Sequence, residues 1–142
     1  MHVCIAVCDH FEPFHATDKK GAMLAMQHWH ERWPGMANRF RDSTGRGPRH
    51  TFFFPIEQYD QDVISSLAEL CQKTGSEVEV HLHHEGDTAE TLEERLRRGV
   101  DQIASHGLLS RDAAGQPVYG FIHGDWALDH SHPEGKHCGV AT

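Results

Sequence analysis

The chain alternates short apolar or β-branched runs with segments that repeat apolar residues at helical spacing, and this alternation restricts the fold most. Glycine and proline punctuate the runs, and no repeat or long linker interrupts them. The resulting order, β-α-β-α-β-α-β, predicts an α/β fold with parallel strands, right-handed crossovers and all strand carboxyl ends on one edge. The expected strands are Val3–Cys8, Thr51–Phe54, Val78–Leu82 and Val118–Ile122.

Three expected helices connect these strands, and each is bounded by residues that cap or break helices. Their apolar positions recur every three to four residues, as on the buried face of an amphipathic helix. The expected helices are Lys19 to about Trp33, with a break at Pro34-Gly35 and a shorter piece through Phe40; Asp60 to Gly75; and Asp87 or Thr88 to Gly107.

Length and charge limit the classes of protein to consider. The 142 residues suffice for one domain with a hydrophobic core but fall short of the roughly 200–250 residues of a closed α/β barrel. The 13 basic and 21 acidic residues give a formal charge of −8, which argues against binding the phosphates of a nucleic acid. We therefore expect a partner other than nucleic acid.

Cysteine usage and hydropathy bear on the compartment. The four cysteines form no C-x-x-C pair, and three lie in apolar settings typical of reduced, buried thiols. No apolar run approaches the ~18 residues of a membrane span, and residues 1–20 lack the pattern of a signal peptide. These features predict a cytoplasmic chain without a membrane span.

Polar groups gather where the expected strands end. The chain carries 14 histidines, and several of them follow strands together with carboxylates. Parallel strands bring such groups to one edge, and imidazole with carboxylate is a ligand mixture used by hydrolytic Zn²⁺ and similar ions. We therefore expect a divalent-metal site among Asp9, His10 and Glu12; His81, His83 and His84; and His123 and Asp125.

The sequence leaves the geometry of the histidine cluster open. His81 and His83 share a face if the third strand continues past Leu82, because strand side chains alternate. His81 and His84 converge instead if a turn begins at His83. Both pairs remain candidates for two ligands of one ion.

Three stretches resemble the NodB-like polysaccharide deacetylases, a family of carbohydrate esterases. H-T-F-F-F-P at His50–Pro55 looks like that family's A-T-F-F-V strand, and S-E-V-E-V-H at Ser76–His81 resembles its H-E-I-G-N-H. G-D-T-A-E-T-L-E-E-R-L-R, which follows at Gly86–Arg97, is similar to the family's turn and helix. The resemblance covers about residues 50–105 and, less closely, the first strand.

The resemblance implies a distorted (β/α) barrel and a divalent metal, zinc being the first choice, held by an acidic residue and two histidines. The family motif T-F-D-D falls on Val7–His10, which makes Asp9 the candidate general base and His10 a metal ligand. The motif H-(S/T)-x-x-H starts at His81. Its second histidine falls on Glu85 without a gap, or on His84 with a one-residue deletion.

The end of the chain departs from the family pattern. G-F-I-H-G-D-W at Gly120–Trp126 stands where the family has R-P-P-Y, with His123 as the nearest polar substitute and candidate catalytic group. Glu12 is the alternative acidic ligand if it bends back toward the site. Because the later motifs have no counterpart, residues 1–142 are expected to form a single partial deacetylase-like domain. Another chain could close this half barrel in an oligomer.

The expected function is metal-dependent removal of an acetyl group from an acetylated sugar or polysaccharide. One alternative is a catalytically silent domain of the same fold that binds a glycan or a metal. A second is a metal-dependent phosphoesterase or amidohydrolase, because both classes use H-x-H pairs such as His81-Leu82-His83.

Overall fold

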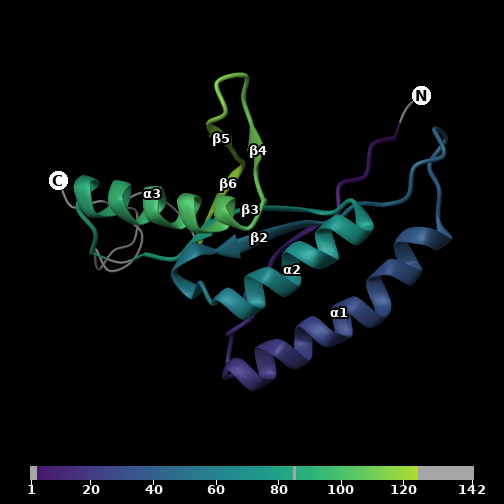
Figure 1. The fold of residues 1–142 in the computed structure, drawn as a ribbon, viewed down its shortest axis with the longest axis horizontal. Helices are drawn as coiled ribbons and strands as arrows, with labels where there is room; N and C mark the ends of the chain where they lie inside the picture. Colours follow the sequence, from purple (N-terminus) through teal and green to yellow (C-terminus); the bar gives the residue numbers. More distant parts are fainter. Residues whose placement is uncertain (1–2, 85, 125–142) are drawn as a thin grey trace.

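Four parallel strands form a single sheet in a computed structural model that describes residues 3–84 and 86–124. The strands lie in their sequence order, β1 (Cys8–His10), β2 (Thr51–Pro55), β3 (Glu77–Leu82) and β6 (Phe121–His123). The sheet curls as half a barrel does, with helices packed against it (Figure 1). The predicted α/β class is confirmed, and the arrangement is compatible with part of a (β/α) barrel.

Three helices make the crossovers, namely α1 (Lys19–Arg39), α2 (Gln61–Thr74) and α3 (Ala89–Ser105). The side chain of Asp60 accepts hydrogen bonds from the first backbone N–H groups of α2, and Gly75 ends α2 in the left-handed conformation at φ 71°. Thr88 caps α3 in a reciprocal capping box with Thr91. The caps expected at Asp60 and Gly75 are confirmed, and Thr88 rather than Asp87 begins the third helix.

Strand alternation gives the sheet two different sides. Phe52 and Phe54 of β2 are fully buried, and Val78, Val80 and Leu82 of β3 are at most 2% exposed. These side chains join the apolar residues of all three helices in one core, and we call this the helix-facing side. The opposite side is the open side, where Glu77 is exposed.

The first strand begins later than the sequence predicts. Val3 and Ile5 are 76% and 84% exposed, and β1 contains only Cys8–His10. The prediction of a strand over Val3–Cys8 is wrong because little of the described chain covers residues 3–7, all of which are exposed. Cys4 and Cys8, expected to be buried, are exposed as a result.

The predicted break at Pro34-Gly35 is also wrong, since α1 continues through Pro34 to Arg39. Trp33 and Ala37 are buried on either side of the proline. Trp33 also donates a hydrogen bond from Nε1 to Ser76 Oγ over 2.9 Å. Packing on both sides of the proline holds the two parts in one helix despite the missing backbone N–H.

A short connection precedes the last strand. β4 (Ser110–Arg111) and β5 (Pro117–Val118) form an antiparallel hairpin that projects from the sheet (Figure 1). The predicted strand Val118–Ile122 is therefore divided. Val118 pairs with Ser110 in the hairpin, whereas β6 pairs with β3.

Candidate metal centre

The register of the sheet puts His10 and His81 on the same side. His10 is the partner of Phe53, and Pro55, two residues further along β2, is the partner of His81. Partners in register, and residues two apart in a strand, point to the same side of a sheet. Both imidazoles therefore lie on the open side, near the carboxyl ends of β1 and β3.

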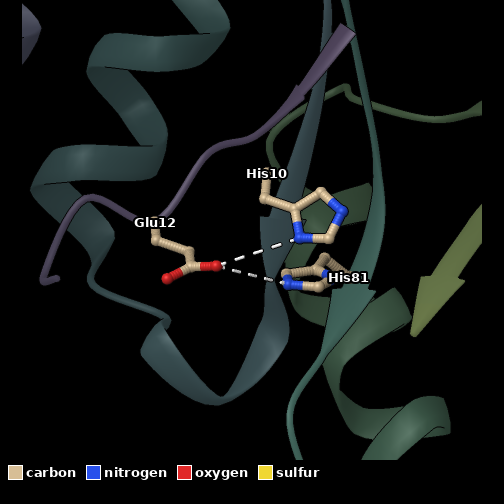
Figure 2. Close-up of side chains that lie close together, drawn as sticks. All are labelled: His10, Glu12 and His81. Carbon is tan, nitrogen blue, oxygen red and sulfur yellow. Dashed lines mark ion pairs between the residues drawn. The ribbon is translucent and has the colours of Figure 1, made fainter. Parts of the chain in front are cut away.

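Glu12 completes a group of three that could hold a metal ion. One ligand atom from each of His10, Glu12 and His81 lies within 4.8 Å of the others. Glu12 Oε1 is 3.9 Å from His10 Nδ1 and 3.7 Å from His81 Nε2, and Figure 2 shows the carboxylate facing both rings. The His81 side chain is fully buried, whereas that of His10 is 48% exposed. The group thus has a closed inner part and an accessible outer part.

A backbone carbonyl fixes the tautomer of His81. Its Nδ1 lies 2.7 Å from the carbonyl oxygen of Ile122 on β6, and a carbonyl can only accept, so Nδ1 carries the proton. Nε2 is left with a lone pair directed toward Glu12. Burial lowers the pKa of His81, the Ile122 bond partly opposes this, and nearby His83 and His10 lower it further. His81 is therefore held in the neutral form that binds metal.

His83 is held in the same way by a side chain. Its Nδ1 lies 2.6 Å from Glu57 Oε1, in the 3-10 turn η1 (Ile56–Gln58). Its Nε2 lies 3.2 Å from His81 Nε2 and 3.3 Å from Glu12 Oε1. Of the two geometries left open by the sequence, the structure brings together His81 and His83.

His84 and His123 lie apart from this group. His123 is the register partner of Leu82, which places it on the helix-facing side. The His84 side chain is fully buried, its ring lies 4.9 Å from that of His123, and its Nδ1 is 3.4 Å from Asp87 Oδ2. The structure thus places these two sequence-based candidates with each other, not with His81.

Asp9 is likewise turned away from the group. Asp9 is the register partner of Phe52, a residue of the buried helix-facing side. Its Oδ1 lies 3.1 Å from Nε2 of His50, which packs against the rings of Trp29 and Trp33. The candidate base and the candidate ligand His10, although adjacent in sequence, point to opposite sides of the sheet.

Sequence reasoning did not single out Glu57, and Glu12 entered only as an alternative. Glu57 follows the second strand within F-P-I-E-Q, where no histidine or paired acid marks it. Glu57 could have been found from its position, because it follows β2, which lies in the sheet between the strands that carry His10 and His81. Glu85 and Asp125, which the sequence also suggested, lie outside the described residues.

No family model, curated protein or solved structure matches this chain. Within the described ranges, none of the helices is both long and apolar enough to cross a membrane.

Proposed function

We propose that this chain is a metal-dependent hydrolase that removes an acetyl group from an acetylated sugar. The observation that carries the proposal is the convergence of His10, Glu12 and His81 at the carboxyl edge of a parallel sheet. Two imidazoles and one carboxylate form the protein ligand set of many hydrolytic zinc sites, which keep a further position for water or substrate. Zinc is the first ion to test.

The residues present fit such an ion. Nδ1 of His81 donates to the Ile122 carbonyl, so the lone pair on Nε2 is available to a metal. In many metal sites an oxygen outside the ligand set orients a ligating imidazole in this way. The partly exposed His10 side chain leaves the site open toward solvent. A divalent ion here would supply Lewis acidity for a carbonyl and would lower the pKa of bound water. His10, Glu12 and His81 would hold the ion, and the fully buried ring of His81 would shield its inner side from solvent.

The proposal does not retain Asp9 as general base or His123 as the second catalytic group. Asp9 faces His50 at 3.1 Å on the other side of the sheet, and His123 belongs to that same helix-facing side. The choice of an acetylated sugar rests on the resemblance of residues 50–105 to polysaccharide deacetylases.

The test is acetate release from an N-acetylglucosamine oligosaccharide and from an O-acetylated sugar. We expect activity to disappear when the metal is removed by chelation and to return with Zn²⁺ or Co²⁺. Losing an outer partner of a metal ligand usually lowers activity about 10- to 100-fold. Glu12→Gln removes a charged ligand itself, so we expect it to lower the rate of acetate release by more than that. Glu69→Gln, at an exposed position of α2, is the matched control.

Two results would contradict the proposal. Acetate release that survives complete metal removal would rule out a metal-dependent reaction. Stoichiometric metal binding without acetate release from either substrate would favour the silent binding domain instead.

A second candidate function is favoured by one observation. His81 and His83 of the H-x-H sequence bring their Nε2 atoms to 3.2 Å, as expected if both bind one ion. Metal-dependent phosphoesterases and amidohydrolases use such pairs. Metal-restored protein that hydrolyses p-nitrophenyl phosphate or a cyclic amide, and releases no acetate, would support this alternative.

A further inference from the structure

His83 is oriented as tightly as His81, although it is not one of the three residues of the metal group. The carboxylate of Glu57 accepts from Nδ1–H of His83 over 2.6 Å, so in the neutral ring the lone pair lies on Nε2. That Nε2 points back toward His81 and Glu12. Two imidazoles, each fixed by an oxygen at Nδ1, therefore present their Nε2 atoms to the same carboxylate.

The spacing of these atoms suits a common ion. Zinc–nitrogen and zinc–oxygen distances of about 2.0–2.2 Å at a tetrahedral angle separate neighbouring ligand atoms by ~3.3–3.5 Å. Nε2 of His83 lies 3.2 Å from Nε2 of His81 and 3.3 Å from Glu12 Oε1, and the third edge, from His81 to Glu12, is 3.7 Å. The corresponding distance from His10 to Glu12 is longer, at 3.9 Å.

The backbone of Gly124 lies close to the His83 ring, on the edge formed by Cδ2 and Nε2. Gly124 follows β6 and donates its N–H to the carbonyl of Leu82 over 2.8 Å. A Cβ atom at this glycine would overlap the imidazole of His83. The Glu57 carboxylate thus fixes one edge of the ring, and the missing side chain of Gly124 leaves room for the ring.

We propose that His83 is a fourth protein ligand of the divalent ion, which would then bind water at a fifth position, and that Glu57 is the positioning residue of His83. This inference rests on the metal site of the proposed function. When both rings are neutral, the lone pairs of the two imidazoles and the carboxylate repel one another at these distances, and a shared cation would outweigh that repulsion. Glu57 acts through His83, because its Oε1 bonds to Nδ1, the ring nitrogen away from the ion.

The first test counts the imidazoles bound to the ion. X-ray absorption spectroscopy of the zinc-loaded protein should show three imidazoles, from His10, His81 and His83. His83→Ala should show two and bind Zn²⁺ more weakly. Circular dichroism and the thermal transition of the metal-free variant check that it folds.

The second test addresses the orienting role of Glu57. We expect Glu57→Ala to raise the Kd for Zn²⁺ about 10- to 100-fold, the usual effect of losing an outer partner of a metal ligand. Glu57→Gln should restore most of the affinity, because its amide oxygen can still accept from Nδ1–H of His83. Glu69→Ala, on the exposed face of α2, should leave the Kd unchanged.

Two results would overturn the inference, namely an imidazole count that is the same in the wild-type and His83→Ala zinc proteins, or a Kd for Zn²⁺ unchanged by both His83→Ala and Glu57→Ala. Either result would leave the metal group of His10, Glu12 and His81 in place if Glu12→Gln still abolishes binding. Failure to release acetate, in contrast, would contradict only the proposed hydrolase activity, because the imidazole count and the Kd do not depend on turnover.

Discussion

Cys71 shows how strongly burial affects a single side chain of this protein. It lies on α2 in the core, where it is 3% exposed, and burial, with a smaller contribution from Glu77, raises the pKa of its thiol to about 12. At pH 8 the thiolate fraction is then on the order of 10⁻⁴. Because the thiolate is the reactive form, Cys71 is expected to be inert in the folded protein.

This expectation can be checked by thiol labelling at pH 8 followed by peptide mass spectrometry. Cys4 and Cys8 are exposed and should be modified rapidly, whereas Cys71 should react only after unfolding in urea. The exposed cysteines serve as internal controls in the same sample. Labelling of Cys71 at the rate of Cys4 would show that the core opens readily or that the thiol is not buried.

At the residue scale, the sequence predicted which strand end carries the histidines but not which histidines meet. His81 and His83 come together at the end of β3, with their Nε2 atoms 3.2 Å apart, and a shift of one residue would have presented His84 instead. Strand alternation also explains why Asp9 and His10 lie on opposite sides of the sheet. The strand was predicted to end at Cys8, whereas it includes both residues, so alternation sends them to opposite sides.

The contact between α3 and the 3-10 turn η1 depends on a glycine inside the helix. Gly99 is buried, and a Cβ at this position would overlap the side chain of Ile56. Alanine is favoured over glycine in a helix by about 1 kcal/mol, but overpacking of a core costs about 1–3 kcal/mol. Because the overlap includes Cβ of Ile56, which cannot rotate away, we expect Gly99→Ala to destabilise the fold by about 1–2 kcal/mol.

Urea unfolding measures this effect, and the chain supplies a matched control. Gly35 also lies inside a helix, α1, and a Cβ there would meet no atom within 4 Å. Gly35→Ala should therefore stabilise the protein by about 0.5–1 kcal/mol. Equal stabilisation by both substitutions would mean that α3 does not pack tightly against Ile56.

At the element scale, local signals predicted the helix ends that depend on one or two residues. The caps at Asp60 and Gly75 follow from side-chain and backbone preferences that act within one turn. The continuity of α1 through Pro34 could not be predicted this way, because it depends on the distant contact of Trp33 with Ser76. The length of β1 likewise depends on what covers residues 3–7 and not on their hydropathy.

At the scale of the whole molecule, the metal group joins segments that the chain connects only through two crossovers. His10 and Glu12 belong to the β1 end, and His81 belongs to β3. An ion bound there stabilises the folded state, by about 2.7 kcal/mol at a free concentration of 100 times its Kd. For a domain of this size we expect the Tm to rise by roughly 5–10 °C.

Thermal unfolding with Zn²⁺ and after chelation measures this shift. Glu12→Gln should lose most of it, whereas Glu69→Gln should retain it. A Tm that does not respond to the ion in the wild-type protein would mean that the three residues do not bind it in the folded state.

The parallel α/β sheet predicted from the sequence is confirmed at this scale, because alternating β and α segments leave few ways to connect the strands. The pairing of His81 with the carbonyl of Ile122 could not be predicted. It requires the exact register between β3 and β6, which the intervening hairpin separates along the chain.

The bond between His81 Nδ1 and the Ile122 carbonyl has a consequence for the folding pathway. It spans 41 residues, so it forms only after β6 has closed a long loop onto β3. Pairing of β2 with β3 closes a shorter loop, which costs less chain entropy, so we expect these two strands to pair earlier. A folding intermediate with β2 and β3 paired but β6 detached would contain all the ligand residues, yet its His81 would be free to take the wrong tautomer. Tight ion capture is therefore expected as a late event, one that reports the arrival of the last strand.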